Sequence, residues 1–198
     1  EYDLAKEIDG QAAATEIARH ELYGCTGAEM VQEMKPYHID FPNVKNNCLR
    51  FEVSPSIEES ATFTDADWAE LGNDFMQRMG LANHQYIIIR HSGTESKKEQ
   101  AHLHILANRV SLSGELYRDN WIGKKATEAA NAIAKERNFV QSQDIGKVNK
   151  AEIKEAMDGV LKKMQGFDLT KFKEELGKRG FKVREARAST GKLNGYYV

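Results

Sequence analysis

Two apolar segments decide the fold of this chain. Residues 85–91 read Gln-Tyr-Ile-Ile-Ile-Arg-His, and residues 102–110 read His-Leu-His-Ile-Leu-Ala-Asn-Arg-Val. Both are short and apolar, and a polar loop of ten residues separates them, which predicts two adjacent strands. Side chains on a strand alternate between faces, so His102 and His104 share one face. If the strands pair, His91 lies at the end of the neighbouring strand, and three imidazoles can converge on one point.

Three converging imidazoles form a ligand set for a metal ion. Neutral nitrogen donors with open coordination positions are typical of a catalytic metal site rather than a closed structural one. Glu99 lies three residues before His102 and is placed to hydrogen-bond the second nitrogen of a ligand. A His-x-His pair alone would equally fit the surface of an antiparallel sheet, but the third histidine and the acidic loop favour the metal site. We therefore predict His91, His102 and His104 as metal ligands.

The remaining patterns predict an α+β fold in which helices flank a central antiparallel sheet. Residues 49–53 alternate as a strand, and Thr64 opens a helix that Gly80 ends. Within it, Trp68, Leu71 and Phe75 recur at helical spacing and should lie in the core. The other predicted helices are residues 11–34, interrupted near Gly24 and Gly27, and residues 121–138, 150–164 and 168–179.

The end of the chain reads as a separate part. Two helices precede a basic β-hairpin, formed by residues 181–187 and 193–198 with a turn at residues 190–192. We therefore predict a core of residues 1–146 and a small helical and β-hairpin part of residues 147–198.

The net charge of −2 over 198 residues conceals an uneven distribution. Residues 1–100 hold 9 basic and 18 acidic side chains, whereas residues 101–198 hold 19 basic and 12 acidic ones. Such an asymmetry predicts that the second half faces a polyanion.

Composition also excludes several classes of protein. Two cysteines without a pattern exclude a disulfide scaffold and a cysteine zinc site. No apolar run is long enough to insert into a membrane, and no signal peptide is recognisable. We therefore expect a cytoplasmic protein. Because the chain begins at Glu1 without a methionine, we interpret it as a fragment.

The histidine segment resembles the third signature motif of relaxases. These enzymes are the mobilization nucleases of conjugative plasmids and transposons, in the HUH endonuclease superfamily. Their pattern is an apolar strand ending in His, a variable loop, and then His-x-His, apolar residues and Asn-Arg, which here is Asn108-Arg109. Residues 21–34, 55–80 and 176–198 are similar to other parts of the family's nuclease region, so the resemblance covers most of the chain.

The resemblance implies an HUH relaxase-like palm and a metal-dependent reaction on DNA. Such an enzyme nicks one strand at an origin of transfer by tyrosine transesterification, which leaves a 5′-phosphotyrosyl DNA intermediate for conjugative mobilization. The implied partners are single-stranded DNA, accessory mobilization proteins and a type IV secretion coupling protein. The family is associated with Mg or Mn, and the imidazole ligands would also bind Zn, Co or Ni in a purified sample.

The resemblance also suggests catalytic residues. Relaxases cut with a tyrosine near the N-terminus, and Tyr2 in Tyr2-Asp3-Leu4 resembles the family's Tyr-x-Leu. The strand that should precede this tyrosine is missing from the sequence, so a nucleophile upstream is the alternative, and Tyr23 is a weaker one. The loop is longer than in the family, which leaves open whether Glu95 or Glu99 supports the metal ligands; we favour Glu99.

We expect DNA to meet the basic half of the chain. Cations interleaved with aromatic residues suit a single strand, because phosphates are neutralised while bases stack. The predicted DNA-binding residues are Asn108, Arg109, Arg118, Lys124, Lys125, Lys182, Arg184, Arg187 and Lys192.

Two other functions compete with this interpretation. A cupin-like metalloenzyme acting on a small molecule would need a many-stranded barrel and a fourth ligand, whereas here Asn108 and a helix-rich half follow the histidines. A non-catalytic DNA-binding module would be favoured if Tyr2 were remote from the metal and no upstream tyrosine existed.

Overall fold

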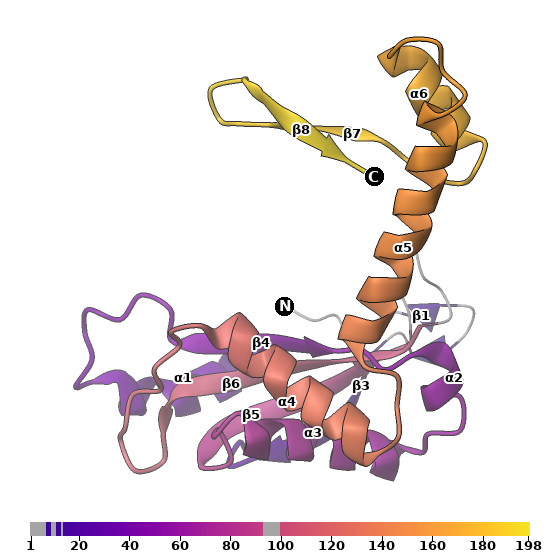
Figure 1. Cartoon of the computed structure of the whole chain (residues 1–198). Coiled ribbons are helices and arrows are strands. Elements are labelled where there is room, and N and C mark those ends of the chain that lie inside the picture. The colour runs from indigo at the N-terminus through magenta and orange to yellow at the C-terminus, as the bar shows by residue number, and fades with distance from the viewer. Residues whose placement is uncertain (1–6, 9–10, 13, 93–99) are drawn as a thin grey trace. The chain divides into compact units, whose positions relative to one another are not determined.

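The computed structural model describes residues 7–8, 11–12, 14–92 and 100–198. They fall into two compact units, Glu1–Val140 and Gln141–Val198 (Figure 1). The sequence pattern suggested a boundary at residue 146, which lies inside a helix of the second unit.

The first unit contains the main sheet and the helices that cover it. Its elements are β1 (Glu7–Ile8), β2 (Gln11–Ala12), β3 (Ala14–His20), α1 (Gly27–Met34), the 3-10 helix η1 (Lys35–His38), β4 (Cys48–Val53), α2 (Ile57–Ser60), α3 (Asp65–Arg78), β5 (His84–His91), β6 (His102–Ser111) and α4 (Ile122–Glu136).

The main sheet has four strands in the order β3-β5-β6-β4, and every neighbouring pair is antiparallel. The predicted pairing of β5 with β6 is therefore confirmed. Its register sets His91 opposite His102 and Ile89 opposite His104. On the other side of β6, Glu52 of β4 lies opposite His104. The chain thus has the expected α+β fold, with an antiparallel sheet flanked by helices.

Helices α3 and α4 form the main core with one face of the sheet. Apolar side chains of α3 recur three or four residues apart, so they form a single face. A Cβ atom on Gly72 would lie 2.7 Å from Cδ1 of Ile88, so glycine allows α3 to approach the sheet closely. The buried residues of this core include Trp68, Leu71, Phe75 and Met76 of α3, Ala129 and Ile133 of α4, and Leu49, Phe51, Ile88, Leu103 and Ile105 of the sheet.

A smaller apolar cluster lies on the opposite face of the sheet. It joins Ala14 of β3, Met30 of α1, and Ile87 and Ile89 of β5. Because His102 and His104 alternate with the core residues Leu103 and Ile105, they lie on this second face.

The predicted helix over residues 11–34 is wrong in its first half. Residues 14–20 form strand β3, which pairs with β5, and helix α1 begins only at Gly27, behind a capping box of Thr26 and Glu29. Alanine, glutamate and arginine favour a helix locally. Pairing with β5 overrides that preference because it satisfies the backbone groups along the edge of β5.

The second unit has its own small core. It contains α5 (Ser142–Leu161), α6 (Leu169–Gly177), β7 (Arg184–Arg187) and β8 (Leu193–Tyr197). The strands β7 and β8 form the predicted antiparallel hairpin, and α5 starts earlier than the sequence suggested. Ala156, Val160, Phe172 and Leu176 form the buried cluster. Over the described residues of both units, no helix has the length and apolar character to cross a membrane.

Candidate metal centre

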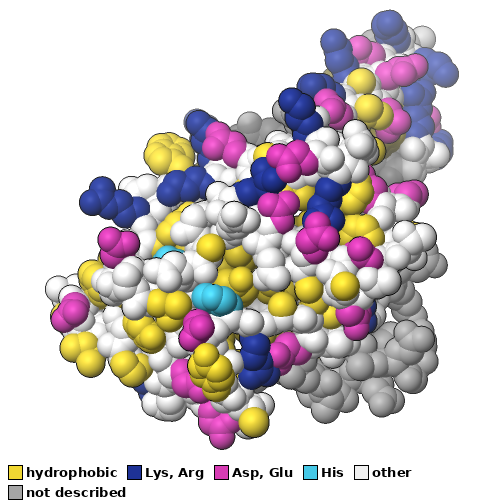
Figure 2. All heavy atoms as spheres, turned by 90° about the horizontal axis from the view of Figure 1, so that it is seen from below, with side chains coloured by type: hydrophobic (Ala, Val, Ile, Leu, Met, Phe, Trp, Pro, Cys, Tyr) yellow, Lys and Arg dark blue, Asp and Glu magenta, His cyan; other side chains and the backbone are white. Residues whose placement is uncertain are grey.

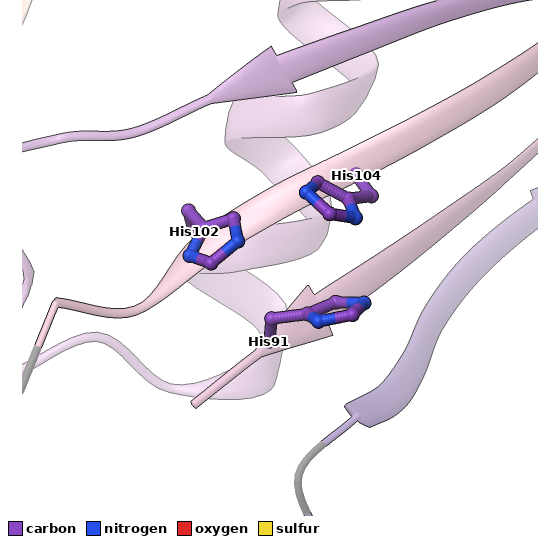
Figure 3. Close-up of side chains that lie close together, drawn as sticks. All are labelled: His91, His102 and His104. Atoms are coloured by element: carbon purple, nitrogen blue, oxygen red, sulfur yellow. The ribbon is translucent and has the colours of Figure 1, made fainter. Parts of the chain in front are cut away.

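The three predicted metal ligands come together where β5 ends and β6 begins. His102 and His104 project from β6 and His91 from the end of β5, so the rings approach one another (Figure 3). The ring centroids of His91 lie 5.4 Å from His102 and 4.3 Å from His104, and those of His102 and His104 are 4.8 Å apart. Each ring offers one nitrogen within 4.8 Å of the others, so the rings would move closer, to roughly 3.4 Å between nitrogens, to share one ion at about 2.1 Å.

The surroundings favour the neutral form of His91 and His104. His102 and His104 are buried, and His91 is partly buried. Burial, and then the neighbouring rings of His91 and His102, lower the pKa of His104 to about 4. Burial and the ring of His102 also lower the pKa of His91. Neutral nitrogen is the form that binds a metal ion, so the donor set fits a divalent cation at neutral pH.

The second nitrogen of His102 has a backbone partner. Its Nδ1 lies 3.2 Å from the carbonyl oxygen of Gln100. Because a carbonyl only accepts, Nδ1 is the donor, which leaves Nε2 as the nitrogen available to a metal ion. This is the usual support of a metal-binding histidine. We expected Glu99 to provide such support; Glu99 and its alternative Glu95 lie outside the described residues.

A carboxylate that the sequence analysis missed also lies at this cluster. Glu52 Oε2 is 3.7 Å from Nε2 of His104, across the β4–β6 pairing. Because Glu52 follows the core residue Phe51 in the strand, alternation predicts that Glu52 lies on the face opposite the core. Its position opposite His104 depends on a register between strands far apart in the sequence.

Asn108 lies on the same face as the histidines but leaves no polar atom free for DNA. It is fully buried, and its Oδ1 is 2.6 Å from Nε2 of His38. Its Nδ2 donates to Oε1 of Gln85 at 2.9 Å and to the carbonyl of Met34 at 3.3 Å. Asn108 therefore connects β6 to β5 and to the end of α1, and the prediction that it contacts DNA is not supported, because it is fully buried.

The other predicted DNA-binding residues differ in availability. Arg109 forms an ion pair with Asp119 at 2.7 Å and also donates to the carbonyls of Asn46 and Tyr117, so it holds together the chain that follows β6. The remaining residues are exposed: Arg118, Lys124 and Lys125 in the first unit, and Lys182, Arg184, Arg187 and Lys192 in the second. Figure 2 shows acidic and basic side chains interspersed over one face of the molecule, so any attraction for DNA there arises from local clusters.

The candidate nucleophile Tyr2 lies outside the described residues. Tyr23 is exposed, and its hydroxyl donates to Glu21 at 3.0 Å. This hydrogen bond and the charges of Glu21 and Glu33 raise the pKa of Tyr23. That environment opposes formation of a phenolate at Tyr23.

Comparison with known proteins identifies the family. A family model described as relaxase, MobA/VirD2-like, nuclease domain, matches residues 2–139. The chain belongs to the relaxase family. The match covers the first unit almost completely and stops where the second begins. This relaxase thus carries a DNA-nicking nuclease domain of a family that binds single-stranded DNA and typically uses a divalent metal. Searches of curated proteins and of solved structures found no match.

Proposed function

We propose that this relaxase nicks one DNA strand at an origin of transfer by tyrosine transesterification, with a divalent metal at His91, His102 and His104. The observation that supports this proposal is the convergence of three imidazoles at the end of the β5–β6 pair. The open four-stranded sheet also gives no support to a cupin-like barrel.

In the proposed reaction, the Tyr2 oxygen attacks the scissile phosphate. A new P–O bond to tyrosine forms, and the bond from phosphorus to the 3′ oxygen breaks. Tyrosine loses its phenolic proton, and the released 3′ oxygen gains one to become a hydroxyl. The 5′-phosphate stays on tyrosine as an ester, so the step is reversible and the strand can be rejoined. A phenol has a pKa of about 10 and is a weak nucleophile at neutral pH, so it depends on positive charge nearby.

The histidines hold a cation without reducing its charge, because imidazole ligands are neutral. When bound, a divalent ion supplies the positive field that stabilises the phosphate oxygens during transfer. Mg or Mn is the expected ion in function, and Zn, Co or Ni would suit the nitrogen ligands in a purified sample. Glu52 adds a negative charge beside His104, which favours retention of the cation.

The proposed DNA contacts lie in both units. Arg118, Lys124 and Lys125 are exposed after β6. In the second unit, residues 141–177 carry seven basic and seven acidic side chains, whereas residues 178–198 carry six basic and one acidic. The hairpin segment therefore accounts for the positive charge of this unit, and its candidate contacts are Lys182, Arg184, Arg187 and Lys192. We place the reaction in the cytoplasm, with accessory mobilization proteins and a type IV secretion coupling protein as further partners.

A covalent adduct tests the proposal directly. The full-length protein is incubated with a labelled single strand that contains the origin of transfer, in the presence of Mg or Mn. We expect an adduct that survives denaturation and is lost with chelator. Tyr2→Phe should abolish it, and Tyr23→Phe should not. An adduct that persists in Tyr2→Phe would exclude Tyr2 as the nucleophile, and the absence of any adduct would overturn the nicking proposal.

The metal ligands are tested separately. His104→Ala should lose both the adduct and high-affinity binding of Mn²⁺ in calorimetry. His20→Asn is the matched control, because His20 lies on edge strand β3 and its Nδ1 is 2.9 Å from the carbonyl oxygen of His84. If His104→Ala bound Mn²⁺ and formed the adduct as well as the unchanged protein, the ligand assignment would be wrong.

A further inference from the structure

Trp121 is the most exposed of the large apolar side chains among the described residues. Its exposed fraction is 82%, against 2% for Trp68 in the core. It stands immediately before α4 with φ 58° and ψ 30°, which is the left-handed region. A bulky residue rarely adopts this conformation, which glycine, asparagine and aspartate adopt most often.

The Trp121 side chain is not buried in the core and makes no capping hydrogen bond, so it gives folding no apparent stabilisation. Trp121 is the N-cap residue of α4. Asparagine would adopt this backbone conformation more readily than tryptophan. An exposed indole with a strained backbone and without a capping bond indicates that the side chain is retained for a contact outside the chain.

The cations around Trp121 indicate the chemistry of that contact. Arg118, Lys124 and Lys125 are exposed on the same short segment. The Arg118 guanidinium makes no hydrogen bond or ion pair with any described residue, whereas the one acidic residue of the segment, Asp119, is paired with Arg109 at 2.7 Å. Lys125 donates to the carbonyl oxygen of Arg118 at 2.9 Å, which fixes the loop that carries Trp121.

We propose that Trp121 stacks on a base of single-stranded DNA, while Arg118 and Lys124 neutralise the adjoining phosphates. An aromatic face between cations matches a nucleotide, which presents a flat base beside an anion. This inference rests on the proposed function, because it assigns a position along the same DNA strand.

The stacked base lies away from the reacting phosphate. The histidines occupy the beginning of β6, whereas Tyr117 bonds to Arg109 near its other end. A strand rises by about 3.3 Å per residue, so the seven residues from His102 to Arg109 span roughly 23 Å. Trp121 should therefore contribute to DNA affinity and not to the chemical step.

Fluorescence provides the test, because the two tryptophans differ so strongly in exposure. The full-length protein is titrated with a short oligothymidylate and with an abasic deoxyribose-phosphate strand of equal length. We expect the oligothymidylate to quench the emission of Trp121, obtained as the difference between the unchanged protein and Trp121→Asn. The abasic strand should bind through its phosphates without this quenching.

Affinity and rate give the second readout. Trp121→Asn should fold at least as stably as the unchanged protein and bind oligothymidylate about fivefold or more weakly. Its nicking rate at saturating DNA should not change. Tyr23→Ala removes another highly exposed aromatic residue, beside Glu21 and Glu33, and should leave affinity unchanged.

The outcomes separate this inference from the proposed function. Equal quenching by the abasic strand, or unchanged affinity in Trp121→Asn, would overturn the stacking assignment while adduct formation persists. Equal quenching by polyglutamate would replace DNA with an acidic peptide as the ligand. Failure of every strand to form an adduct would overturn the nicking proposal instead.

Discussion

Glu52 combines high exposure with a position beside a buried histidine. About 60% of its side chain is exposed, and its carboxylate lies 3.7 Å from Nε2 of His104. The charge of Glu52 raises the pKa of His104, but burial and the two other rings outweigh it. Because the pKa of His104 stays at about 4, protons compete little for this nitrogen at pH 7. We therefore expect the main effect of Glu52 to be on the cation that the proposed function places at the histidines.

We expect Glu52→Gln to weaken binding of Mn²⁺ about tenfold, within the range found when a residue that supports a metal ligand is changed. Titration calorimetry at pH 7 measures this affinity. Glu70→Gln is the control, because Glu70 lies on α3 and pairs with Arg137 at 3.0 Å. Equal affinities in the two variants would show that Glu52 has no influence on the metal.

The lowered pKa values of His91 and His104 predict a pH dependence of stability. Without metal, the unfolded chain binds protons near pH 6.5, whereas folded His104 binds one only near pH 4. The free energy of unfolding should therefore be highest above pH 6.5 and should fall as the pH drops toward 4. Urea unfolding in the presence of chelator measures the slope, and His104→Gln should flatten it. A slope unchanged in this variant would contradict the lowered pKa.

Single residues of the site were predictable where strand alternation decides them. The three histidines needed only the apolar pattern of residues 85–91 and 102–110 and the assumption that the two strands pair. Asn108 satisfies the same alternation, yet the end of α1 and η1 cover its part of the face and bury it. Strand alternation predicts on which face of the sheet a side chain lies, but it does not predict which helix covers that face.

Strands and helices differ in how far the sequence determines them. Helix α3 was predictable because its apolar spacing lies within it, and its cap Thr64 and terminal Gly80 lie beside its ends. Strand β3 was not, because residues 14–20 favour a helix locally and become a strand only through pairing with β5, about 70 residues later. The pairing of β4 with β6 could not be predicted either, because the two strands are about 50 residues apart in the sequence.

The cap of α3 allows a quantitative test. Thr64 Oγ1 accepts from the backbone N–H of Asp67 at 3.3 Å, and Asp67 Oδ2 accepts from that of Thr64 at 2.7 Å. Thr64→Ala should lower the free energy of unfolding by about 1 kcal/mol, as measured with urea. Thr127→Ala, in the exposed interior of α4, should cost nothing, since alanine favours a helix. A Thr64→Ala variant as stable as the Thr127→Ala control would mean that the capping box is not formed.

The whole molecule consists of two units with separate cores. The clusters around α3 and α1 involve only residues of the first unit, and the cluster around α5 and α6 only residues of the second. The relaxase match ends at residue 139, and the first unit ends at Val140. The second unit is thus outside the matched nuclease domain.

A chain that stops at Val140 should fold and keep its affinity for Mn²⁺, because every described ligand and both sheet clusters remain. Thermal unfolding and calorimetry test this. The salt dependence of DNA binding should become weaker, since the cations of residues 178–198 are lost. A chain that stops at Gly123 is the control; it lacks Ala129 and Ile133 of the core and should not fold. Loss of folding at Val140 as well would show that the two units depend on each other.

The pairing of β5 with β6 also has a consequence for the order of folding. These strands are close in sequence, so a short loop closes between them, whereas β3 and β4 must join after much longer loops. Short loops cost less chain entropy and close sooner. All three histidines belong to this early pair, so if they bind a divalent ion as proposed, the ion has a binding site before the sheet is complete. The metal would then act as a nucleus for folding as well as a ligand of the finished protein.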